Sequence, residues 1–82
     1  MHAIDHVVAR FPKQASIVRR LYLSDEHFRA VCEDYLLCIN SLTKFEARPD
    51  ANSRPEVAEY RQLRQELELE MATYVKASKV LR

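Results

Sequence analysis

Apolar and polar positions alternate with helical spacing along almost the whole chain. The clearest pattern is a heptad stripe, here called the first seam, in which apolar residues follow one another at three and four positions: Phe28, Val31, Tyr35, Cys38, Leu42 and Phe45. Such a stripe is typical of a helix that packs lengthwise on another helix, as in a coiled coil. Ser24 is a suitable N-cap, and the acidic Asp25 and Glu26 suit a first helical turn. The pattern predicts a long helix over about residues 25–46.

A second heptad stripe fills the C-terminal third of the chain. Ser53 followed three residues later by Glu56 is a capping-box pattern, and Pro55 suits a first helical turn. Pro49 restricts the residue before it, which favours a loop between the two stripes. We therefore expect a second long helix over about residues 54–80, with a second seam that includes Tyr60, Leu67, Met71 and Tyr74.

The N-terminal quarter predicts one or two short helices over about residues 1–23. Ile4, Val7, Val8 and Phe11 share one helical face, and Pro12 then interrupts the pattern. Two long helices joined by a short loop predict a long antiparallel helical hairpin, covered in part by the short helices. The expected fold is a single all-α domain over residues 1–82, a small helical bundle.

Composition supports this fold class. The chain has no glycine and only three prolines, which argues against the many tight turns of a small β-rich fold. Nearly half of the residues are hydrophobic and the net charge is +1, which argues against disorder. Neither a signal peptide nor a stretch long enough to span a membrane is visible. With Cys32 and Cys38 read as reduced, buried thiols, we expect a cytoplasmic protein.

Several short motifs resemble the YdcH-like family of small bacterial proteins. They are the pair Phe11-Pro12, the pair His27-Phe28, and the run Leu67-Glu68-Leu69-Glu70-Met71, and the similarity covers roughly residues 11–75. Arg64 falls where the family favours a basic residue, whereas Gln65 and Leu69 replace its more frequent leucine and aspartate, and residues 1–10 extend beyond its usual start. The resemblance implies a helical hairpin in a bacterial cytoplasm. It supplies no catalytic residues, because the family has no established activity.

No pattern in the chain predicts catalysis. His2 and His6 have the spacing of two helical metal ligands, but a metal site needs three or four ligands held rigidly. Phosphate-binding loops depend on glycine, which this chain lacks. We therefore expect neither an enzyme nor a bound metal or cofactor.

The expected function is protein–protein interaction. A core of this size gives little net stability, and the apolar face of the first long helix is wider than one neighbour covers. We expect a homo-oligomer, a dimer or larger, in which the seam residues form packing or subunit contacts, and another protein partner is possible. The alternative is a small nucleic-acid-associated regulatory protein that uses the basic residues Arg10, Lys13, Arg19 and Arg20, although the nearly balanced charge argues against nucleic acid.

Overall fold

The computed structural model describes residues 3–80, and over this range the chain is helical without any strand. This confirms the all-α class. The four α-helices of the described range are α1 (Ala3–Arg10), α2 (Ala15–Ser24), α3 (Glu26–Glu46) and α4 (Pro55–Val80). Two single turns of 3-10 helix, Pro12–Gln14 and Ala51–Ser53, lie in the connections.

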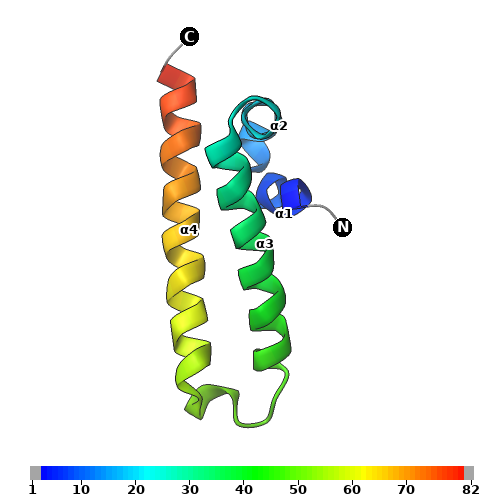
Figure 1. Ribbon diagram of the computed structural model, residues 1–82, viewed down its shortest axis with the longest axis vertical. Coiled ribbons are helices and arrows are strands. Elements are labelled where there is room, and N and C mark those ends of the chain that lie inside the picture. The colour runs from blue at the N-terminus through cyan, green and yellow to red at the C-terminus, as the bar shows by residue number, and fades with distance from the viewer. Residues whose placement is uncertain (1–2, 81–82) are drawn as a thin grey trace.

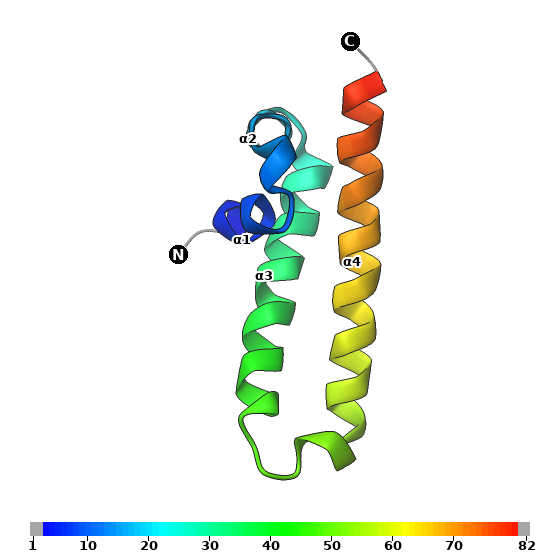
Figure 2. The ribbon, with the colours of Figure 1, turned by 180° about the vertical axis from the view of Figure 1, so that it is seen from behind.

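The two long helices determine the shape of the molecule. Figures 1 and 2 show α3 and α4 side by side and running in opposite directions, with α1 and α2 against the half of α3 that is farther from the α3–α4 loop. The α2 helix also contacts α4. The described part of the chain measures 47 × 22 × 22 Å. One half of the molecule is therefore a bundle of four helices, and the other half consists of α3 and α4 alone.

The core follows the heptad pattern because each long helix directs one face at its neighbours. Phe28, at the start of α3, is completely buried, and its ring meets that of Tyr74 edge to face with 5.5 Å between centroids. Near the loop, the rings of Phe45 and Tyr60 stack at 5.6 Å. The described core consists of Ala3, Val7, Val18, Phe28, Val31, Cys32, Tyr35, Cys38, Leu42, Ala51, Val57, Leu67, Met71 and Val75.

The start of α3 differs from the sequence prediction in its cap. Ser24 is the last residue of α2, and its hydroxyl donates a hydrogen bond to the carbonyl oxygen of Arg20 at 2.8 Å. Asp25 is the N-cap instead, with its carboxylate accepting from the backbone N–H of Phe28 at 3.0 Å. Asp25 alone links α2 to α3, so its extended backbone sets the sharp turn between them.

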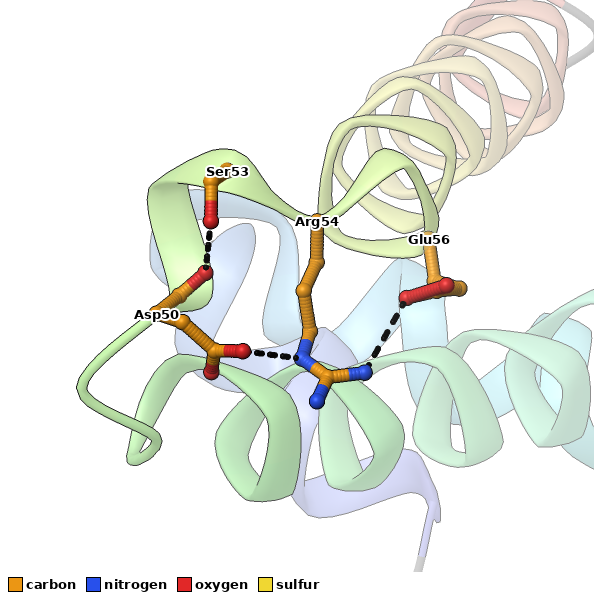
Figure 3. Close-up of polar contacts among 4 residues, drawn as sticks. All are labelled: Asp50, Ser53, Arg54 and Glu56. Carbon is orange, nitrogen blue, oxygen red and sulfur yellow. Dashed lines mark hydrogen bonds and ion pairs between the residues drawn. The ribbon is translucent and has the colours of Figure 1, made fainter.

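The predicted capping box at the start of α4 is also wrong. Ser53 lies in a 3-10 turn, and its hydroxyl donates to the carbonyl oxygen of Asp50 at 2.9 Å, so it does not cap α4 (Figure 3). Arg54 holds the loop together through its Nε, which donates to Asp50 at 3.0 Å, and an ion pair with Glu56 at 3.9 Å. This hydrogen bond from Arg54 keeps the pKa of Asp50 below its ordinary value. The ring of Pro55 opens α4, where no backbone donor is needed.

The N-terminal segment is broken at Pro12, as the sequence predicts, but the regular part of α2 begins only at Ala15. Pro12 starts a 3-10 turn, and the N–H of Gln14 donates to the carbonyl of Phe11 at 3.1 Å.

Within residues 3–80, none of the helices combines the length and the apolar character needed to cross a membrane.

Candidate interaction surface

An apolar groove runs between α3 and α4 and is the main candidate site. Its central part has a volume of about 420 Å³, and it continues toward the loop as a second hollow of about 390 Å³ that shares Tyr60 and Leu63. We call the whole depression the groove. It is lined by Asp34, Leu37, Cys38, Ser41 and Phe45 of α3 and by Glu56, Glu59, Tyr60, Leu63 and Leu67 of α4.

Two leucines give the groove its character. Leu37 is 65% exposed and Leu63 is 40% exposed, and they belong to different helices but line the same hollow. Large apolar side chains that are exposed together in a concave surface are typical of binding sites for other protein surfaces. Leu37 is exposed because Cys38, the next residue along the helix, takes the position that faces α4.

The residues of the two seams are mostly occupied inside the chain. Phe28, Val31, Tyr35, Cys38, Leu42, Leu67 and Met71 are buried, while Phe45, Tyr60 and Tyr74 are half-buried. Among these ten, only Cys38, Phe45, Tyr60 and Leu67 also line the groove. The surface left for a partner is therefore the flank of the seams, and its centre is formed by two leucines outside both seams.

A hydrogen-bonded polar cluster lies on the opposite side of α4 from Leu63. Tyr35 donates its hydroxyl to Glu68 at 2.7 Å, and Nε of Arg10 lies 3.5 Å from the same carboxylate oxygen. Burial first, and then the bond to Glu68, raise the pKa of Tyr35 well above its ordinary value. This cluster joins α1, α3 and α4 through a single carboxylate, which the sequence reasoning did not find. No sequence pattern marks Glu68 apart from the other glutamates of the helix.

Both cysteines are buried and free, as the sequence indicates. Burial, with a smaller contribution from the charge of Glu33, raises the pKa of Cys32 to about 12. The pKa of Cys38 is also raised by burial, and its Sγ donates to the carbonyl oxygen of Tyr60 at 3.2 Å. Because the thiolate is the reactive form, neither sulfur is a good nucleophile at neutral pH.

We expect the free energy of unfolding to be flat from neutral pH to about pH 9 and to fall steadily above it. The pKa of Cys32 rises from 9.0 to about 12 on folding, so the folded state holds the proton that the unfolded state loses in this range. Urea unfolding followed by circular dichroism at a series of pH values tests this. The Cys32→Ala variant should lose stability less steeply above pH 9 than the parent protein, and an equally steep loss would contradict the assignment.

The predicted basic residues do not act as one free group. Arg10 is engaged by Glu68 and lies over the ring of Phe11, with its guanidinium carbon 5.3 Å from the centroid. Lys13, Arg19 and Arg20 are exposed on the 3-10 turn and α2.

Of the two histidines with the spacing of metal ligands, His2 and His6, only His6 lies within the described residues. His2 lies outside the described residues, and within residues 3–80 no three His, Cys, Asp or Glu side chains are grouped as metal ligands.

Within residues 3–80 the groove thus combines two exposed leucines with charged rims and the buried thiol of Cys38. Comparison of the chain with protein-family models, with curated proteins and with solved structures gives no match.

Proposed function

We propose that this protein is a non-enzymatic helical interaction module that associates with itself through the groove. The observation that supports this most directly is the pair of exposed leucines, Leu37 and Leu63, on opposite walls of one hollow. An enzyme would need polar groups that converge on one reacting atom, whereas the interior of the groove presents apolar side chains and a backbone-bonded thiol.

The thinness of the molecule near the loop supports a second copy as the partner. There α3 and α4 form a single layer, because α1 and α2 contact only the other half of α3 (Figure 1). Amphipathic helices are stable when their apolar faces are covered by a second layer. In a two-fold dimer the same patch is used by both subunits, so the leucines of one copy would meet those of the other.

The proposal extends to a helical hairpin of the YdcH-like kind in a bacterial cytoplasm. The motifs that suggest this have a structural reason in this chain. Phe28 is completely buried while His27 beside it is exposed, and in the run of residues 67–71 only Leu67 and Met71, one helical turn apart, are buried. These residues therefore support the packing of the hairpin, and they give no sign of a shared chemistry.

Self-association through the groove predicts a large effect of charge at Leu37. We expect the parent protein to be a dimer in light scattering coupled to size-exclusion chromatography, and Leu37→Glu to shift it to the monomer mass. The reason is that a carboxylate buried in an apolar interface loses its hydration without gaining a partner. Helicity should be unchanged, because Leu37 is 65% exposed in the single chain.

Leu69→Glu is the matched control. Leu69 is also 65% exposed and also lies in the middle of a long helix, but it lines a separate hollow beside Phe11 instead of the groove. This variant should keep the mass of the parent protein. A monomeric parent protein, or equal behaviour of the two glutamate variants, would contradict the proposed function.

A further inference from the structure

We propose that in this dimer α3 lies antiparallel to α3 of the second copy, with Asp34 facing the partner's Lys44. This inference rests on the proposed self-association and specifies its geometry. It comes from a short stripe on the exposed flank of α3, here called the α3 stripe, which consists of Asp34, Leu37, Ser41 and Lys44.

The α3 stripe has the spacing of a contact surface between helices. Its residues follow one another at three, four and three positions, so they share one face of α3. Three of them, Asp34, Leu37 and Ser41, line the groove. Asp34 and Lys44 are exposed, and neither has an ion-pair partner among residues 3–80. The stripe therefore has one large apolar residue, Leu37, beside the small Ser41 at its centre, and one unpaired charge of each sign at its ends.

The order of the charges makes the stripe complementary to itself only when the two helices run in opposite directions. Asp34 and Lys44 stand at equal distances from the point midway between Leu37 and Ser41, roughly 7.5 Å along the axis. A two-fold axis at that point places Asp34 of each copy opposite Lys44 of the partner subunit, which gives two ion pairs in the dimer. It also brings Leu37 beside the partner's Ser41 and gathers the exposed leucines at the centre.

Other arrangements of two copies leave the charges in conflict. If α3 met the partner's α3 in the same direction, aspartate would face aspartate and lysine would face lysine. If the two copies pointed the same way with α3 against the partner's α4, Asp34 would come level with Glu66 and Glu70 of the partner subunit. Like charges placed across an interface weaken binding and exclude the wrong arrangement.

Charge exchange at Asp34 and Lys44 tests this register. We expect Asp34→Lys and Lys44→Glu each to weaken the dimer by about tenfold in dissociation constant, as two exposed ion pairs become two repulsions. The double variant Asp34→Lys/Lys44→Glu should return to the affinity of the parent protein, because both pairs form again with exchanged signs. An equimolar mixture of the two single variants should likewise form a mixed dimer.

Sedimentation equilibrium measures the four constants, and Arg19→Glu is the matched control for Lys44→Glu. Arg19 is an exposed cation on α2, outside the groove, so its reversal should leave the constant unchanged. Circular dichroism checks that each variant remains helical. Tighter binding by Asp34→Lys would overturn the antiparallel register in favour of α3 against the partner's α4, and no change in any charge variant would show that Asp34 and Lys44 lie outside the interface. Either result would leave the proposed function standing if Leu37→Glu still gives monomers.

Discussion

Replacing Leu42 with aspartate is expected to unfold the protein under conditions in which the parent protein is fully folded. Leu42 belongs to the first seam and is only 2% exposed, within the apolar core. A carboxylate at this position loses its hydration and finds no cation in the core, because all the buried residues around it are apolar. Costs of this kind exceed about 4 kcal/mol, which is a large part of the stability of so small a domain.

The far-ultraviolet circular dichroism spectrum at 25 °C, with a thermal melt, measures this effect. Leu37→Asp is the control, because it introduces the same charge into the same helix at a site that is 65% exposed. That variant should keep its helicity and melt close to the parent protein at low concentration, where dimers do not contribute. A folded Leu42→Asp protein with an unchanged melting temperature would show that the first seam does not form the core.

Replacing Phe28 with alanine should cause the second largest loss of stability, about 3–5 kcal/mol. Phe28 is completely buried at the start of α3, where α2, α3 and α4 come together, and its ring packs against Tyr74. Removal of the ring leaves a cavity that helices fixed on several sides cannot collapse to fill. The free energy of unfolding in urea is the appropriate measurement, since the variant should remain folded without denaturant.

Phe45→Ala provides the comparison at the other end of the molecule. Phe45 stacks on Tyr60 but is half-buried in the part that α3 and α4 form alone, so truncation there should cost clearly less than at Phe28. Equal losses for the two phenylalanines would contradict the difference in layering between the two ends.

The sequence was sufficient for the all-α class because the signal that carries it is local. The chain has no glycine, and its apolar residues recur at helical spacing, a pattern that depends only on residues within a few helical turns of each other. Leu42 and Met71, which belong to this pattern, both lie in the core. The caps were predicted less well. Ser24 and Asp25 are both residue types that favour the N-cap position. Asp25 is the N-cap because it has the extended backbone between α2 and α3, whereas Ser24 is still part of α2.

The loop before α4 shows a similar limit. Ser53 and Glu56 have the spacing of a capping box, but the fold of the loop brings Arg54 between Asp50 and Glu56, and a guanidinium makes stronger contacts with carboxylates than a hydroxyl does (Figure 3). The serine hydroxyl donates instead to the carbonyl oxygen of Asp50, which also accepts from the backbone N–H of Ser53. Residue type alone does not decide between such competing partners.

The sequence by itself determined that this chain forms helices and which face of each long helix is apolar, because both depend on residues three or four positions apart. Only the tertiary structure decided which apolar residues remain outside. Leu37 and Leu42 are both leucines of α3, and the packing of the other elements against α3 buries Leu42 and leaves Leu37 exposed in the groove. The same packing joins Arg10 to Glu68, which are 58 residues apart in the chain, so the charge of Arg10 is paired although its side chain stays 52% exposed. Contacts between distant residues follow from how the helices are placed, and the candidate site is made of such contacts.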